Sequence, residues 1–227
     1  FQVHLYSGTS STNAQTLGGY SDLQPDLIWL KGRTGGVSSH VIVDTSRSGK
    51  ELNPDNDDAD ENDAGFDTFN SDGFTVSGVD NHYNNNSYTY VAWCWKANGG
   101  TTSSNTNGTI TTTVQANATA GFSIATYTGV GAARTIGHGL ASAPKFMLIK
   151  NRTAAANWNT SCWFLTGDND KKLMLNITDA ESSTSNFQDT DPSSTVVSIG
   201  GGNEVGGQWE NVGNYNYIAY FWIPIQG

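Results

Sequence analysis

The chain has 227 residues and a formal net charge of −10, from 11 Lys and Arg against 21 Asp and Glu. This charge would repel phosphate backbones and anionic lipid headgroups, so we expect no nucleic acid and no membrane surface among the partners. No apolar run approaches the roughly 18 residues that a membrane-spanning helix needs, so membrane insertion is not expected either.

Short strands joined by turns are the predicted elements along the whole chain. Thr, Val, Ile, Trp, Tyr and Phe are plentiful and are interrupted every few residues by Gly, Asn, Ser and Asp. This punctuation is typical of strands and turns rather than helices. We therefore predict an all-β protein.

The sequence also repeats itself, with the second copy beginning near the midpoint. Three blocks return in the same order: 1–8 as 122–129, 25–34 as 144–153, and 90–95 as 217–222. The repeated blocks are rich in strand residues, while the segments between them differ in length and polarity, so the duplication preserved a scaffold. We predict two tandem related halves, each a β-sandwich or a jelly-roll-like fold.

A polar segment separates the two copies. We assign 1–98 to the first β repeat, 99–121 to a linker and connecting strand, and 122–227 to the second β repeat. The Gly, Ser, Thr and Asn residues of 99–108 are typical of a linker, and the β-branched residues of 109–115 favour a strand.

The two best predicted strands, 27–30 and 91–95, are apolar on both faces instead of alternating. Such strands must be covered on both sides, by a second layer of the chain, by the other half, or by a neighbouring subunit. We expect the halves to pack on each other, or the protein to form a homo-oligomer, with a trimer as one form, or both.

Signatures of catalysis and of cofactor binding are missing. The chain has no Gly-x-Ser-x-Gly, no His-Glu-x-x-His, no Cys-x-x-Cys, and no glycine-rich phosphate loop. We expect no cofactor and no catalytic residues. Carboxylate pairs of the kind used in glycoside hydrolysis have no spacing rule in sequence, so an enzyme stays among the alternatives.

The acidic segment 55–63 supplies the oxygen ligands that Ca²⁺ prefers, but it lacks the Gly and the final Glu of an EF-hand loop. A solvated acidic loop is the other interpretation. The four histidines are scattered and none is duplicated in the second copy. We therefore expect no metal site.

Candidate binding residues lie in the polar loops that precede the closing strand of each copy. Asn side chains can hydrogen-bond sugar hydroxyls, and aromatic rings offer flat faces to a pyranose ring. The alternative is that these residues only form turns and pack back on the sheet. The candidates are Asn81, His82, Tyr83 and Asn84 in the first half and Trp209 in the second. Trp158 is a further candidate, as an exposed anchor for a partner or, alternatively, as the residue that opens a strand.

Several segments carry a resemblance to a known family. They are 25–33 (PDLIWLKGR), 69–76 (FNSDGFTV), 90–96 (YVAWCWK), 121–129 (GFSIATYTG) and 137–144 (GHGLASAP). Together they resemble a domain of unknown function found in virion proteins of tailed bacteriophages, especially aquatic ones. The acidic segment 55–63 departs from the shorter, more neutral loop of that family.

The resemblance implies a non-enzymatic virion protein, such as a tail fibre, a tail tip or a capsid-surface component, which is extracellular when assembled. Its expected partners are copies of itself, other virion proteins and host-surface glycans. The alternative function is a free-standing carbohydrate-binding module or lectin. A third is a polysaccharide-degrading enzyme of the virion.

Overall fold

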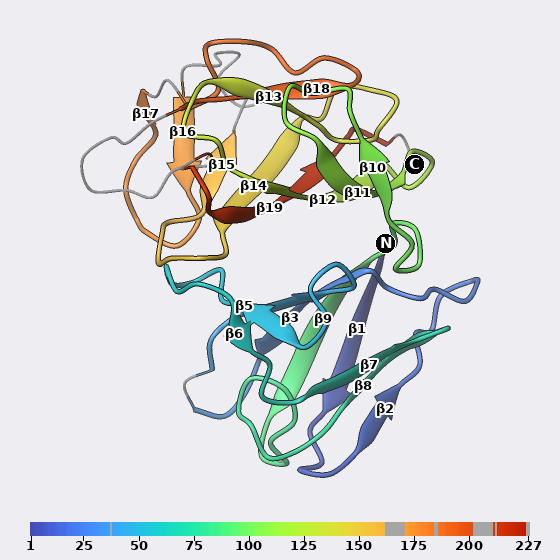
Figure 1. The fold of residues 1–227 in the computed structure, drawn as a ribbon. Coiled ribbons are helices and arrows are strands. Elements are labelled where there is room, and N and C mark those ends of the chain that lie inside the picture. The colour runs from blue at the N-terminus through green and yellow to red at the C-terminus, as the bar shows by residue number, and fades with distance from the viewer. Residues whose placement is uncertain (37, 162–170, 184–185, 202–210, 212, 226–227) are drawn as a thin grey trace. The chain divides into compact units, whose positions relative to one another are not determined.

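The structure is a computed structural model that describes residues 1–36, 38–161, 171–183, 186–201, 211 and 213–225. The described residues form strands and no helix, which confirms the all-β prediction (Figure 1). In particular, they contain no helix long and apolar enough to cross a membrane. The chain divides into two compact units, unit 1 with Phe1–Asp55 and Asp60–Gly100, and unit 2 with Asn56–Ala59 and Thr101–Gly227.

Unit 1 consists of a six-stranded and a three-stranded antiparallel sheet. The larger sheet has the order β1(Gln2–Ser7), β9(Thr89–Trp95), β3(Leu27–Gly32), β4(Val41–Asp44), β5(Lys50–Leu52), β6(Glu61–Asn62). The smaller has the order β2(Asn13–Gln15), β8(Gly73–Val76), β7(Phe66–Asn70). One core joins the two sheets, since Ile28, Leu30 and Tyr90 of the larger sheet cluster with Phe74 and Val76 of the smaller. This is the arrangement of a β-sandwich.

Unit 2 has the same plan with an eight-stranded and a two-stranded sheet. The larger has the order β10(Ser103–Asn105), β11(Thr112–Asn117), β12(Phe122–Thr128), β19(Asn216–Trp222), β14(Phe146–Asn151), β15(Asn159–Ser161), β16(Lys171–Met174), β17(Ser182–Ser183). The smaller pairs β13(Arg134–Gly137) with β18(Val196–Ile199). Met147, Ile149 and Phe221 of the larger sheet cluster with Val197 and Ile199 of the smaller.

The strand order displays the internal duplication. The run β12-β19-β14-β15-β16-β17 of unit 2 repeats the run β1-β9-β3-β4-β5-β6 of unit 1. Core contacts repeat as well: Tyr6 stacks on Tyr90 with ring centroids 5.0 Å apart, and Tyr127 stacks on Tyr217 at 5.2 Å. Unit 2 differs by adding β10 and β11 beside β12, and these two strands lie within the segment 99–121.

Candidate functional site

The loop that precedes β9 contains four of the candidate binding residues, and two of them are buried. Tyr83 and Asn84 have no exposed surface. The prediction that their side chains offer a glycan-binding surface is therefore wrong, because these side chains point into unit 1. Asn81 is exposed, and the side chain of His82 is 31% exposed.

Asn84 ties this loop to the segment that follows β1. Its Oδ1 accepts hydrogen bonds from the Thr9 amide at 3.0 Å and from Asn13 Nδ2 at 2.9 Å. Its Nδ2 donates to the carbonyl oxygens of Ser11, at 2.5 Å, and of Gly78, at 3.3 Å. A buried amide with both ends satisfied is a structural crosslink between two loops.

Unit 2 repeats this crosslink with Asn211, which is also fully buried. Asn211 Oδ1 accepts from the Val130 amide at 2.8 Å, as Asn84 Oδ1 does from the Thr9 amide. Its Nδ2 donates to the Ala132 carbonyl oxygen. The sequence carried a signal for the pair, since each Asn stands six residues before the matched Tyr90 or Tyr217.

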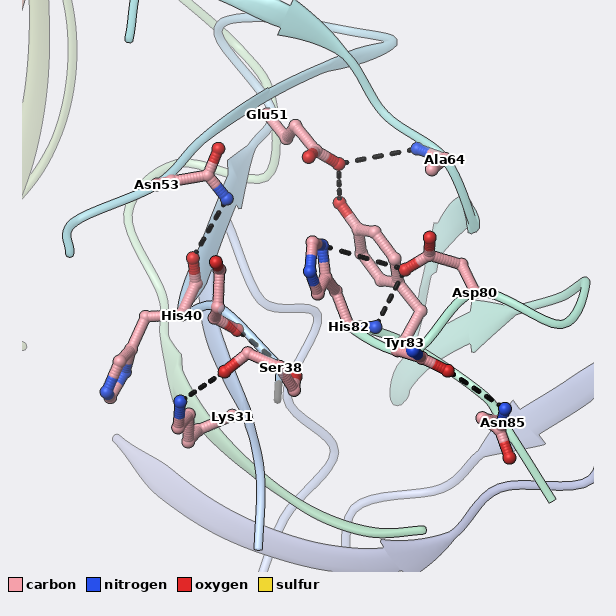
Figure 2. A network of polar contacts seen from close by, with 12 residues as sticks. Lys31, Ser38, His40, Glu51, Asn53, Ala64, Asp80, His82, Tyr83 and Asn85 are labelled. Carbon is pink, nitrogen blue, oxygen red and sulfur yellow. Dashed lines mark hydrogen bonds and ion pairs between the residues drawn. The ribbon is translucent and has the colours of Figure 1, made fainter. Parts of the chain in front are cut away.

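Tyr83 is held by a buried carboxylate, that of Glu51 on β5 (Figure 2). Tyr83 Oη donates to Glu51 Oε2 at 2.5 Å, and the Ala64 amide donates to the same oxygen at 3.3 Å. Burial raises the pKa of Glu51, and burial together with the Glu51 charge raises the pKa of Tyr83 well above its ordinary value. The proton therefore stays on the phenol, and Glu51 acts as an acceptor that positions the loop.

The exposed part of this network consists of Asp80 and His82. The Asp80 carboxylate accepts a hydrogen bond from the His82 amide at 2.7 Å and lies 3.7 Å from His82 Nδ1 (Figure 2). The first contact closes a turn, as Asp side chains commonly do. The second is an ion pair only when His82 is protonated.

The other half of Figure 2 shows contacts around β3 and β4. Lys31 Nζ donates to the Ser38 carbonyl oxygen, and Asn53 Nδ2 donates to the His40 carbonyl oxygen at 3.0 Å. Trp29 Nε1 donates to His40 Nδ1 at 2.9 Å. These contacts tie Ser38 and His40 to β3 and to the chain just after β5.

Trp158 does not serve as an exposed anchor, because its side chain is fully buried. The flanking chain is paired at this point: the Trp158 amide donates to Asn176 Oδ1 at 2.9 Å, and the Leu175 amide donates to the Trp158 carbonyl at 3.1 Å. The prediction of an exposed role for Trp158 is therefore wrong. Trp209 lies outside the described residues.

Carboxylates of the acidic segment 55–63 make contacts within the protein. Asp60 accepts from Arg47 Nη1 at 2.8 Å, and Asp55 accepts from the His40 amide at 3.1 Å. Asp58 accepts from Asn56 Nδ2 at 2.7 Å. Within the described part of the chain, no group of three or more His, Cys, Asp or Glu side chains is placed to hold a metal ion.

One side of the larger sheet of unit 1 is apolar, and we call it the outer face. It carries the exposed side chains of Phe1, Val3 and Leu5 and the half-buried rings of Trp29, Trp93 and Trp95, while Leu27 and Ile42 on the same side are fully buried. Val3 pairs with Trp93, which pairs with Trp29, so these side chains share one side of the sheet, opposite the core. Phe1, Val3 and Leu5 are 61%, 52% and 57% exposed. Aromatic contacts continue the surface, with the Phe1 and Trp95 rings 4.8 Å apart.

The matching side of the larger sheet in unit 2 carries Ile124, Tyr220 and Leu148 in the places of Val3, Trp93 and Trp29. The two halves therefore share a scaffold with apolar side chains on this side of the sheet. Exposed apolar patches on a stable protein mark surfaces for association.

A second surface feature of unit 1 is an open pocket of about 340 Å³ between the turn after β4 and strand β7. Phe66 and Phe69, whose rings are 4.5 Å apart, form one wall, and Asp63 and Asp67 supply carboxylates. Burial raises the pKa of Asp63, and the nearby Asp67 charge adds to the effect. Aromatic walls beside hydrogen-bonding groups suit a small polar ligand.

Comparison with known proteins gives one match. A protein-family model described as "Domain of unknown function (DUF7483)" matches residues 1–227. No curated protein and no solved structure matches the chain.

Proposed function

We propose that this chain, which belongs to the DUF7483 family of domains of unknown function, is a non-enzymatic structural protein of a bacteriophage virion. It is a component of a tail fibre, a tail tip or the capsid surface, is extracellular when assembled, and associates with copies of itself and with other virion proteins. The resemblance of the segments 25–33, 69–76 and 90–96 supports the virion setting.

The observation that carries the assembly part is the outer face. Phe1, Val3 and Leu5 are each more than half exposed although their neighbours on β9 are aromatic or aliphatic. Fully burying a side chain of this size stabilises a protein by about 1.5–3 kcal/mol, so leaving three uncovered is costly unless association covers them. A self-assembling structural protein would cover them.

The virion setting is tested on particles. Antibodies raised against the purified chain are applied to purified particles of a phage that encodes it, and bound antibody is located by immunogold electron microscopy. Label at the tail or on the capsid surface is the expected result. Particles that contain no such chain, by immunogold and by mass spectrometry of their proteins, would overturn the proposal.

Carbohydrate binding is the second candidate function, and the pocket beside β7 favours it. The rings of Phe66 and Phe69 offer apolar faces, while Asp63 and Asp67 can accept hydrogen bonds from sugar hydroxyls. The net charge of −10 favours neutral or basic sugars over acidic ones. This site is separate from the loop at 80–86, for which the sequence composition predicts glycan contacts.

A glycan array followed by calorimetry tests this candidate. A sugar that binds through the pocket should lose at least about tenfold in affinity in Asp63→Asn or Asp67→Asn, because each removes a charged acceptor. Tyr20→Ala is the matched control, since Tyr20 is fully exposed and does not line the pocket. Equal loss in all three variants, or no binding on the array, would reject it.

A further inference from the structure

The pocket beside β7 lies between the two sheets of unit 1, on the side away from β1 and β2. The smaller sheet contributes β7, and the larger contributes the turn after β4, with Thr45, Ser48 and Gly49. Strand β7 is one end of the smaller sheet and β2 is the other (Figure 1). In unit 2 the chain before β12 contacts β12 and, through Ile110, β13, and these strands match β1 and β2. What lies beside β1 therefore does not decide whether this pocket is open.

A shift in the strand pairing arranges the aromatic wall of the pocket. The register of β7 with β8 shifts between Phe66 and Thr68, so Asp67 is an additional residue, as in a β-bulge. Phe66 and Phe69 are three residues apart and would lie on opposite sides of a regular strand. The additional residue brings both rings to one side, with centroids 4.5 Å apart. The Phe74 ring, 6.4 Å from that of Phe66, supports the wall from the core, so the wall is in place before a ligand binds.

Two carboxylates beside this wall keep the capacity to accept hydrogen bonds. Asp67 Oδ1 accepts from Ser77 Oγ at 2.6 Å, and the Phe66 amide donates to the Asp63 carboxylate. A carboxylate can accept about four hydrogen bonds, so each can take a further donor. Burial and the nearby Asp67 charge raise the pKa of Asp63, so a bound cation would relieve the repulsion between the two carboxylates.

Among the described residues that line the pocket, none is Lys, Arg or His. The two basic residues of the adjoining turn have other partners. Arg47 pairs with Asp44 at 2.7 Å and with Asp60 at 2.8 Å. Lys50 Nζ donates to Asn62 Oδ1 at 2.7 Å. Because the whole chain carries a net charge of −10 as well, the electrostatic field at this pocket favours a positively charged ligand.

We propose that this pocket binds an amino sugar, with the charged ammonium group between Asp63 and Asp67 and the sugar ring against Phe66 and Phe69. The inference rests on the carbohydrate binding that is the second candidate function, and it names the class of sugar. The ammonium group makes charge-assisted hydrogen bonds with the carboxylates. Its contact with an aromatic face adds a cation–π attraction.

The rest of the lining suits the body of such a sugar. Gln24, Ser48 and Thr68 add an amide and two hydroxyl groups, which can hydrogen-bond sugar hydroxyls. The volume of about 340 Å³ lies near the lower end of the range for small-ligand sites, which suits a single sugar residue.

A titration with three sugars tests the requirement for a charge. Glucosamine, N-acetylglucosamine and glucose share one ring, but only glucosamine carries an ammonium group at about pH 6. Binding is measured from the NMR chemical shifts of the isotope-labelled full chain. Glucosamine should bind at least about tenfold more tightly than either neutral sugar and should shift the backbone amides of 66–69.

Cyclohexylamine tests whether the ligand is a sugar. It has an ammonium group and a six-membered ring but no hydroxyl groups. It should bind at least about threefold more weakly than glucosamine, because it cannot use the hydroxyl and amide groups of the lining.

Matched charge variants test the location. Asp67→Asn should lower the preference for glucosamine over glucose at least about threefold, because it removes one of two charges and keeps the shape of the side chain. Asp179→Asn removes the same charge from an exposed position of unit 2 and should leave the preference unchanged.

The outcomes separate this inference from the proposed functions. Neutral sugars that bind as tightly as glucosamine overturn the ammonium site and leave carbohydrate binding standing. Cyclohexylamine that binds as tightly as glucosamine overturns the sugar as the ligand. A preference that survives Asp67→Asn, or falls equally in Asp179→Asn, overturns this pocket as the site. A chain that binds none of the three sugars overturns this inference and the carbohydrate candidate together, and leaves the virion proposal standing.

Discussion

Replacing Asn84 with alanine removes the crosslink between the loop before β9 and the segment after β1. The side chain makes four hydrogen bonds, to Thr9, Asn13, Ser11 and Gly78. A buried hydrogen bond contributes about 1 kcal/mol net, and water can replace Asn84 at some of its partners, because Thr9, Ser11 and Gly78 are exposed. We therefore expect Asn84→Ala to lower the free energy of unfolding of unit 1 by about 2–4 kcal/mol.

Two further variants sharpen this expectation. Asn84→Asp keeps the acceptor but loses both donors and buries a charge that faces carbonyl oxygens, so it should cost at least as much as alanine. Asn86→Ala is the matched control in the same loop, because Asn86 is exposed and its side chain makes only a 3.5 Å contact with Ser87. The control should change stability by less than about 0.5 kcal/mol.

Urea denaturation measures the loss, and hydrogen–deuterium exchange assigns it to a unit. Asn84→Ala should raise exchange in peptides of unit 1, and Asn211→Ala should do the same in unit 2, because Asn211 makes the matching contacts with Val130 and Ala132. A loss below about 1 kcal/mol for Asn84→Ala, or a loss equal to that of Asn86→Ala, would refute the reasoning that these amides are structural crosslinks.

Three further predictions concern buried titratable groups. Burial raises the pKa of Glu51, so the free energy of unfolding of unit 1 should fall as pH rises from the ordinary pKa of this group through its raised pKa. Glu51→Gln should flatten this fall in urea titrations at several pH values, and a steeper fall would contradict the reasoning. Burial lowers the pKa of His138 to about 4, so the contribution of the neutral ring to the stability of unit 2 is lost as pH falls from about 6.5 towards 4. His138→Gln should flatten this loss of stability in acid, whereas an unchanged loss would show that His138 does not cause it. Burial raises the pKa of Cys94 to about 12, so in a Cys162→Ser variant the native thiol should react with a disulfide reagent at least about 100-fold more slowly than the denatured one; equal rates would disprove its burial.

The scaffold could be predicted from sequence because strands leave a local signature. The blocks 1–8, 25–34 and 90–95 and their repeats carry β-branched and aromatic residues between turn residues, and they correspond to β1, β3 and β9 and to β12, β14 and β19. Two copies of one pattern also imply two copies of one strand order, which the sheets display.

The side of a loop that faces the core could not be predicted from composition. Asn and Tyr residues before β9 suit a glycan site and a buried crosslink equally well, and Tyr83 and Asn84 are buried because Glu51 and the segment after β1 supply their partners. The sequence does contain one signal for the crosslink: Asn84 and Asn211 stand at equal distances before the closing strands. This match lies outside the strand residues that define the repeat. The burial of Trp158 could not be predicted either, because small and polar sequence neighbours do not show whether a ring is covered.

The side of β1 that faces the core could not be predicted from the sequence either. Strand β1 alternates between Gln2, His4 and Tyr6 on one side and Val3 and Leu5 on the other, and hydropathy alone would bury the second set. The structure places Tyr6 in the core, stacked on Tyr90 5.0 Å away, and leaves Val3 and Leu5 exposed. Which side of a strand meets the second sheet depends on contacts distant in sequence.

The measurement that tests the central claim most directly is the mass of the purified chain in solution, by light scattering across a range of concentrations. The exposed side chains of Phe1, Val3 and Leu5 predict a homo-oligomer that persists on dilution into the micromolar range. A chain that remains a monomer of 24.2 kDa even at high concentration would contradict the account.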